Sequence, residues 1–223
     1  MKWTRIPSLT HLSTREILST VLQDFIAVNE SQWNKIEGSV ALVREGDGYN
    51  SLTSSADGSK LLATGRLSSV YRSVNYGANW TKIDALDFGA AGGEWGSVKC
   101  SSGFEVCLAM QFKAPSYENG EIFRSVDGGL TWAAVSGTQK GAWANAACHA
   151  TGQTWVATLS FQWVFGNPPG GIYVSTDYGQ SFTMVPGSDT NARYRSAACD
   201  ATFAHCVIGT ASSALSSYVL VKA

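Results

Sequence analysis

The pattern of apolar and polar residues repeats four times along the chain. Each repeat opens on an aromatic residue, continues as a short run of small and apolar residues, turns through a polar or glycine-containing segment and ends in a second apolar run. The repeats begin at Tyr49, Trp95, Trp143 and Tyr194 and align without gaps over their first half. Two short apolar runs joined by a tight polar turn are typical of paired antiparallel strands. The pattern therefore predicts four hairpins at nearly regular intervals.

A second motif follows three of these hairpins. Segments 73–80, 125–132 and 175–182 each read S-x-(D/N)-x-G-x-x-(W/F), and their final aromatics lie about 50 residues apart. An apolar run precedes each copy and another begins at its aromatic residue, which predicts a third and a fourth strand joined by the motif. A degenerate copy ends at Trp33. Four short antiparallel strands per repeat predict an all-β fold, with each repeat as one blade of a small propeller.

These repeats predict a single domain, residues 1–223, made of five four-stranded blades. The expected blades are 8–37, 38–84, 85–136, 137–186 and 187–223 together with 1–7. The last blade lacks a fourth strand, and the segment 2–6 (KWTRI) mirrors 79–83 (NWTKI), so we expect the N-terminal strand to close the ring. The compressed first blade has an alternative, because residues 17–25 also carry helical spacing behind a capping-box-like STRE.

The repeated motif resembles the Asp-box, or bacterial neuraminidase repeat, of sialidase-like β-propellers. Three copies at a regular period carry this resemblance. It implies that the boxes are structural turns on the outer, non-catalytic side, where the Asp or Asn accepts turn amides, the Gly adopts a positive φ and the aromatic packs beneath. The box residues are Ser73, Asn75, Gly77, Trp80, Ser125, Asp127, Gly129, Trp132, Ser175, Asp177, Gly179 and Phe182.

Catalysis by this family needs more than the sequence offers. Segment 5–7 (RIP) resembles the sialidase segment that supplies one substrate-binding arginine. The chemistry also needs two further arginines, an acid/base aspartate, and a tyrosine nucleophile with a glutamate partner. Arg193 and Arg195 are candidate late arginines and Asp24 is a candidate acid, but no Tyr–Glu pair can be assigned. We therefore predict no catalytic residues, and a sialidase-like glycoside hydrolase stays as the alternative.

Composition and charge narrow the class of partner. The formal net charge is -1, charged residues make up 15% of the chain and no basic block is present, so we expect no nucleic-acid partner. No apolar run approaches the length of a membrane helix, so we expect no membrane insertion. Because the three histidines are scattered and CxxC pairs are missing, we expect no metal site and no cofactor.

The cysteines indicate a redox environment. Cys100 with Cys107 and Cys199 with Cys206 share one spacing, and both pairs flank the same hairpin turn of the repeat. Facing strand positions bring Cβ atoms to disulfide distance, so we predict two hairpin disulfides, with free buried thiols as the alternative. Cys148 is left over as a small buried residue. Disulfides favour an extracellular or virion-associated protein, although no signal peptide is visible and the cytoplasm stays open.

Long loops are expected on one face of the propeller. Segments 85–94, 111–120 and 161–171 leave this long-loop face, and function usually lies on such loops. The inner strands begin there with aromatics, which either pack between blades or stack on a sugar. Two residues later each inner strand carries a small polar residue. Candidate ligand-binding residues are Trp163, the leading one, with Tyr117, Tyr49, Trp95, Trp143 and Tyr194.

These features predict a non-enzymatic binding or adhesion module. It would recognise a glycan or a protein partner through the long-loop face, as a component of a virion, a surface or a larger assembly. Besides the hydrolase, a structural or assembly-factor propeller stays open. The sequence does not identify the ligand.

Overall fold

The computed structural model describes eight stretches of the chain: 3–5, 49–65, 69–86, 93–114, 120–161, 169–188, 192–211 and 219–222. The predicted first blade, its helical alternative, Trp163 and Tyr117 lie outside these described residues. The described residues form strands with one short 3₁₀ helix, η2 (Asp84–Leu86). The predicted all-β class is therefore confirmed.

In the described part of the chain, sixteen strands make four antiparallel sheets, each of four strands. The sheets, in the order of their strands, are β2 (Tyr49–Ser54), β3 (Leu61–Gly65), β4 (Val70–Ser73), β5 (Thr81–Ile83); β6 (Glu94–Cys100), β7 (Cys107–Lys113), β8 (Ile122–Ser125), β9 (Ala133–Ala134); β10 (Trp143–Cys148), β11 (Trp155–Phe161), β12 (Pro169–Ser175), β13 (Thr183–Met184); and β14 (Arg193–Cys199), β15 (Cys206–Ala211), β16 (Val219–Lys222), β1 (Trp3–Arg5).

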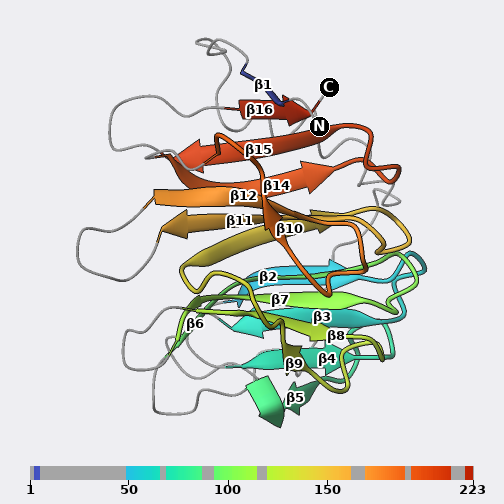
Figure 1. Cartoon of the computed structure of the whole chain (residues 1–223). Helices are drawn as coiled ribbons and strands as arrows, with labels where there is room; N and C mark the ends of the chain where they lie inside the picture. The colour runs from blue at the N-terminus through green and yellow to red at the C-terminus, as the bar shows by residue number, and fades with distance from the viewer. Residues whose placement is uncertain are drawn as a thin grey trace.

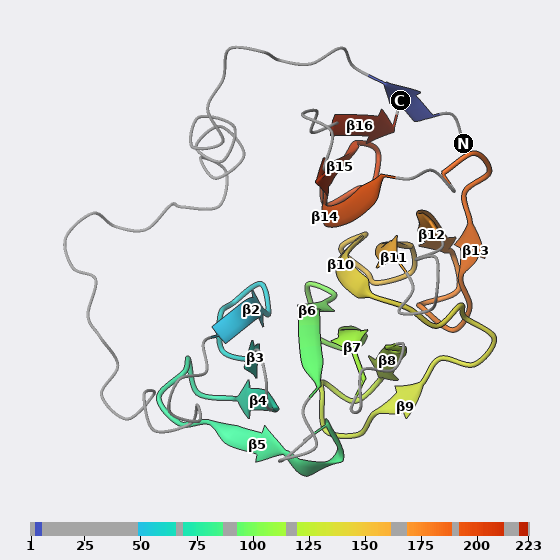
Figure 2. The same ribbon diagram turned by 90° about the vertical axis from the view of Figure 1, so that its left-hand side faces the viewer.

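The sheets stand side by side around a common centre, as blades of a propeller do (Figures 1 and 2). Strands β2, β6, β10 and β14 lie on the inner side, and β5, β9 and β13 lie on the outer side (Figure 2). The first three sheets follow the predicted order of hairpin, third strand, motif turn and fourth strand, and the last sheet takes β1 as its fourth strand. Four blades lie within the described residues, and the fifth stays a prediction.

The N-terminal strand completes the last sheet, as predicted. β1 pairs antiparallel with β16, with Trp3 opposite Lys222 and Arg5 opposite Leu220. The last sheet therefore combines the two ends of the chain, and the outer edge of β16 is covered.

Removing residues 1–7 should lower the free energy of unfolding by about 2–3 kcal/mol, since a few net ladder hydrogen bonds of about 1 kcal/mol each are lost. It should also promote aggregation, because β16 becomes an unpaired edge. Urea unfolding and size-exclusion chromatography measure the two effects. A truncated protein that stays monomeric and equally stable would contradict the role of β1.

The hairpin turns of neighbouring sheets are joined by a chain of backbone hydrogen bonds. The Ala56 amide donates to the Ser102 carbonyl at 2.8 Å, the Ser102 amide to Ala150 at 2.8 Å, and the Ala150 amide to Ala201 at 2.9 Å. The donors occupy the same position in successive repeats. The blades are thus linked by main chain as well as by apolar packing.

The motif turns are held by hydrogen bonds from their own side chains. Ser125 Oγ donates to Asp127 Oδ1 at 2.7 Å and accepts from the Gly129 amide at 2.9 Å, while Asp127 accepts the amides of Leu130 and Thr131. Gly129 has φ +82°, which explains the glycine. Burial raises the pKa of Asp127, but these hydrogen bonds outweigh it and lower the pKa to about 2. Turn 175–182 repeats this arrangement, and turn 73–80 does so with Asn75.

An arginine of one sheet donates a hydrogen bond to the motif turn of the next sheet. Arg72 Nε donates to the Gly128 carbonyl at 2.7 Å, and Arg124 Nε donates to the Tyr178 carbonyl at 2.6 Å. The equivalent residue of the third described sheet is Val174. The following sheet has no motif turn there, because its last two strands come from the two ends of the chain. The arginine hydrogen bond therefore occurs where the next blade has a motif turn with a carbonyl to accept it.

The aromatics that end the motif turns are less buried than expected. Trp80, Trp132 and Phe182 are half-buried, and Trp132 and Phe182 pack on the rims of core clusters. Each turn holds its aromatic near the surface, next to the short outer strand. The fully buried tryptophans are instead Trp95, Trp143 and Trp155. The box aromatics therefore pack at the edge of the core, beneath their turns.

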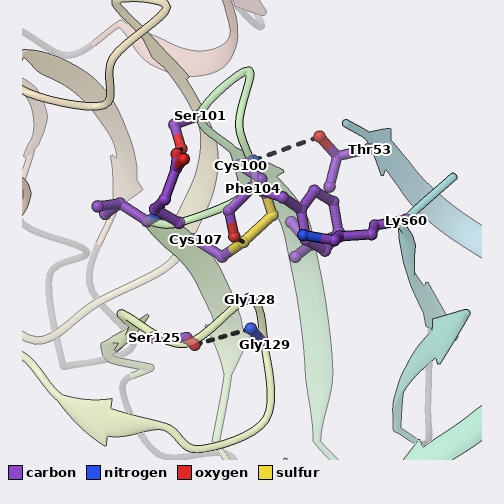
Figure 3. The surroundings of a disulfide bond; sticks show 12 residues. Thr53, Lys60, Cys100, Ser101, Phe104, Cys107, Ser125, Gly128 and Gly129 are labelled. Atoms are coloured by element: carbon purple, nitrogen blue, oxygen red, sulfur yellow. Dashed lines mark hydrogen bonds between the residues drawn. A yellow bond between two sulfur atoms is a disulfide. The ribbon is translucent and has the colours of Figure 1, made fainter. Parts of the chain in front are cut away.

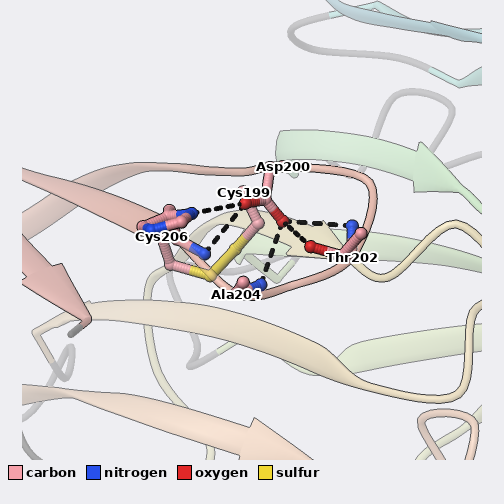
Figure 4. A network of polar contacts seen from close by, with 6 residues as sticks. Cys199, Asp200, Thr202, Ala204 and Cys206 are labelled. Atoms are coloured by element: carbon pink, nitrogen blue, oxygen red, sulfur yellow. Dashed lines mark hydrogen bonds and ion pairs between the residues drawn. A yellow bond between two sulfur atoms is a disulfide. The ribbon is translucent and has the colours of Figure 1, made fainter.

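Both predicted disulfides are present, Cys100–Cys107 (Figure 3) and Cys199–Cys206 (Figure 4). Each joins directly opposite residues at the end of a hairpin. Cys148 is free, and burial raises its pKa to about 12, against a smaller opposing effect of Lys99. The two bridges indicate an oxidising environment.

The bridged hairpins share an unusual turn residue. Phe104 and Phe203 are buried and have φ +69° and +58°, whereas the unbridged hairpins carry Gly58 and Gly152 at the same position, each with φ +73°. A non-glycine residue in the left-handed region costs about 1–2 kcal/mol. In the second bridged turn, hydrogen bonds from His205 and Thr202 lower the pKa of Asp200 (Figure 4). A disulfide and a buried ring accompany each strained turn.

Candidate functional site: an axial pocket

The inner strands share an irregularity at their first residues. The register shifts between Tyr49 and Ser51, Trp95 and Ser97, Trp143 and Asn145, and Tyr194 and Ser196. A β-bulge places an extra residue on one strand and turns its side chain away from the regular alternation. The extra residues are Asn50, Gly96, Ala144 and Arg195.

The four bulge residues meet in one pocket of about 270 Å³, which we call the axial pocket. Glu94, Trp95 and Phe112 complete its lining. Glu94 begins β6 and Phe112 lies near the end of β7, so the pocket lies at the end of these strands from which the predicted long loops leave. Residues from all four described sheets therefore converge at one place.

A glycine lets two inner strands approach closely at this pocket. A Cβ on Gly96 would lie 2.3 Å from the Trp143 carbonyl oxygen, so only glycine lets β6 and β10 approach this closely. Asn50 Nδ2 donates to the carbonyls of Trp95 and Gly96, the latter at 3.2 Å. Because its nitrogen is committed to these carbonyls, Asn50 presents its Oδ1 as an acceptor.

Two arginines stack on phenylalanine rings beside the pocket. The Arg195 guanidinium lies 5.0 Å from the centre of the Phe112 ring, and that of Arg193 lies 5.2 Å from the centre of the Phe161 ring. The two rings meet edge to face at 5.9 Å. Burial, and next to it the charge of Arg193, lower the pKa of Arg195. The rings hold both guanidiniums in place without neutralising them.

Three of the four described inner-strand aromatics follow the packing alternative. Trp95, Trp143 and Tyr194 are buried, with exposed fractions of 0%, 0% and 2%, and they pack between blades. Tyr49 is 48% exposed and meets Tyr71 edge to face at 6.5 Å. Of these four candidates, Tyr49 alone presents a face to solvent. The packing alternative describes the other three.

The small polar residues of the inner strands have unequal surroundings. Ser97 is buried, Ser51 Oγ accepts the Val98 amide at 3.2 Å, and Ser196 is exposed. Asn145 is half-buried, and its backbone amide donates to Thr158 Oγ1 at 3.1 Å. Among these side chains Ser51 links β2 to β6, while Ser97 Oγ and Asn145 Oδ1 are buried without a hydrogen-bond partner among the described residues.

Sequence reasoning missed Asn50, Glu94 and Phe112, and it named Arg195 only as a candidate late arginine. A period-two pattern gives no sign of a bulge, so the direction of the residue after each aromatic could not be read. The available signal was the position itself, which holds a polar residue in two repeats (Asn50 and Arg195) and a very small one in the other two (Gly96 and Ala144).

The described residues contain no group of three or more metal-ligating side chains. Among the same residues, no helix is long and apolar enough to cross a membrane. A second pocket, of about 340 Å³, lies by Trp132, Arg124 and Gln180 at the motif turns. Arg124 is already engaged there with Tyr178. The axial pocket is the better candidate because side chains of opposite charge converge in it.

No protein-family model matches the sequence. No curated protein matches it either. Similar solved structures include an ancestral GH74 enzyme, at 15% identity and a TM-score of 0.61 over 78% of this chain and 25% of that one. The fold is a β-propeller. The GH74 xyloglucanase from Xanthomonas campestris is 17% identical, with a TM-score of 0.56 over 78% of this chain and 28% of that chain.

A computationally designed protein, Ika4, is similar at 9% identity and a TM-score of 0.53, over 84% of this chain and 98% of that one. By contrast, this chain spans about a quarter of the length of each of the two GH74 enzymes. At these identities the likeness concerns the arrangement of the blades.

Proposed function

We propose that this propeller is a non-enzymatic binding module that recognises a glycan or a protein partner through its long-loop face, with the axial pocket receiving part of the ligand. The convergence of the four bulge residues carries the proposal. Two of them, Asn50 and Arg195, offer polar groups, while Gly96 and Ala144 leave space between them. Bulges that turn side chains toward one point are frequent next to functional sites.

The composition of the pocket favours binding over hydrolysis. Glycoside hydrolysis by the usual route needs two carboxyl groups about 5–9.5 Å apart across the scissile bond. Among the described residues that line the axial pocket, Glu94 is the single carboxylate. A glycoside hydrolase is therefore the second candidate, and an activity assay separates the two.

The environment proposed for the module is extracellular, on a surface or a virion. The two disulfides support an oxidising compartment. Trp163 and Tyr117 belong to the segments that leave the long-loop face and stay predicted contact residues.

The function is tested on a glycan array and by affinity capture from the surface of candidate host cells. Against any ligand that binds, Arg195→Ala should raise Kd at least tenfold, because a hydrogen bond to a charged group contributes about 1.5–3 kcal/mol and about 1.4 kcal/mol is tenfold in Kd. Trp163→Ala should also weaken binding while leaving the melting temperature nearly unchanged.

Glu105→Gln is the control for this experiment, since Glu105 lies in the hairpin turn 101–106 at the other end of β6. Unchanged affinity in both Arg195→Ala and Trp163→Ala would place the site elsewhere. Release of reducing sugar from sialosides or xyloglucan, lost on Glu94→Gln, would establish the hydrolase instead.

A further inference from the structure

Opposite charges face the axial pocket without neutralising each other. Glu94 and Arg195 both line it, yet neither forms an ion pair within the described part of the chain. Arg195 is instead stacked on Phe112. Lys113 lies opposite Glu94 in the ladder but does not line the pocket. A carboxylate and a guanidinium are thus held apart on the walls of one small cavity.

The acceptors of the pocket are separate from its donor. Asn50 directs its nitrogen to the Trp95 and Gly96 carbonyls, which leaves Oδ1 as an acceptor alongside the Glu94 carboxylate. Arg195 carries only donors. A ligand ammonium would find acceptors on Glu94 and Asn50, while a ligand carboxylate would find the guanidinium of Arg195.

From this arrangement we propose that the axial pocket binds a small zwitterion, an ammonium and a carboxylate carried on one amino-acid-sized group. A ligand with one charge would leave the opposite wall unpaired or repelling, so the pocket selects against simple anions and simple cations. The inference rests on the proposed binding function of this pocket and names the chemistry of its ligand.

The size of the pocket agrees with a ligand of this kind. Pockets for drug-sized ligands typically enclose about 300–1,000 Å³. At about 270 Å³ the axial pocket lies just below that range. One amino acid, or one terminal residue of a partner chain that carries both charges, is of suitable size.

The test is calorimetric titration of the whole chain with L-alanine, N-acetyl-L-alanine and L-alaninamide, repeated with the twenty standard amino acids. The two alanine derivatives remove the ammonium and the carboxylate in turn. We expect at least one free amino acid to bind, and its N-acetyl and amide derivatives to bind at least tenfold more weakly. A peptide ending in lysine, which has both charges on one residue, distinguishes a partner chain from a free amino acid as the source.

Variants assign the two charges. Glu94→Gln should weaken binding of the zwitterion at least tenfold while sparing the N-acetyl derivative, and Arg195→Gln should do the same while sparing the amide. The control Glu105→Gln should stay within about threefold of the parent chain.

Equal affinity for a zwitterion and its single-charge derivatives would overturn the inference, as would no binding of any amino acid or lysine-terminated peptide at millimolar concentration. If array ligands or captured proteins still bind and their binding depends on Arg195, the proposed binding function stands and the zwitterion inference fails. If those ligands are indifferent to Arg195 and Trp163, the proposed function itself fails.

Discussion

Reduction of both disulfides should lower the free energy of unfolding by about 4–5 kcal/mol. Each bridge, Cys100–Cys107 and Cys199–Cys206, closes a short loop with a sequence separation of 7, and chain entropy assigns about 2–2.5 kcal/mol to a loop of this size. For a domain of this length the expected fall in melting temperature is about 10–20 °C. Denaturant unfolding with and without reductant measures the loss.

The turn residues sharpen this expectation. Phe104 and Phe203 hold left-handed backbone conformations that disfavour any side chain, so the bridged hairpins have less local propensity to form alone than the glycine turns. A variant with all four bridging cysteines changed to alanine is the control and should not respond to reductant. Intact mass should show two bridges and one free thiol. A reduced protein as stable as the oxidised one would rule out this role.

Replacing Trp155 by alanine should cost about 3–5 kcal/mol of stability, the range for removing a large buried side chain. Its ring is fully buried, and its Nε1 donates to the Gly152 carbonyl at 2.6 Å, so both packing and a hydrogen bond are lost. Trp132→Ala should cost less, about 1–2 kcal/mol, because Trp132 is half-buried at the edge of the core.

Urea unfolding of the two variants side by side tests this ranking. The comparison separates two positions of tryptophan in the repeat pattern. One is a core residue of a second strand, and the other is a motif aromatic near the surface. A larger loss for Trp132→Ala would contradict this ranking by burial.

Repetition explains why much of the fold could be predicted. The four aromatic-led hairpins and three motif turns fix strand order, and the match between segments 2–6 and 79–83 indicates the β1–β16 pairing. The same alignment places Cys100 opposite Cys107 and Cys199 opposite Cys206. These features depend on spacing, which a sequence displays directly.

The candidate site depends on departures from the repeat, and these are harder to read. The direction of the residue that follows each inner-strand aromatic is set by a one-residue bulge, and a bulge leaves no mark in an alternating pattern. Trp95 and Tyr49 occupy the same repeat position, yet one is buried and the other exposed. The pairing of Arg195 with Phe112 joins different blades, so no local signal foretells it.

Because hydrogen bonds join the hairpin turns of neighbouring blades, hydrogen exchange can distinguish two kinds of motion in this fold. The side chains of Ala56 and Ser102 are exposed, while their amides are committed to the carbonyl of the next blade. Fraying of a single hairpin and separation of two blades would release different amides. The exchange rates of the Ala56, Ser102 and Ala150 amides therefore report the separation of neighbouring blades. Faster exchange at one amide indicates that one pair of blades separates, and similar rates at all three indicate that the blades separate together.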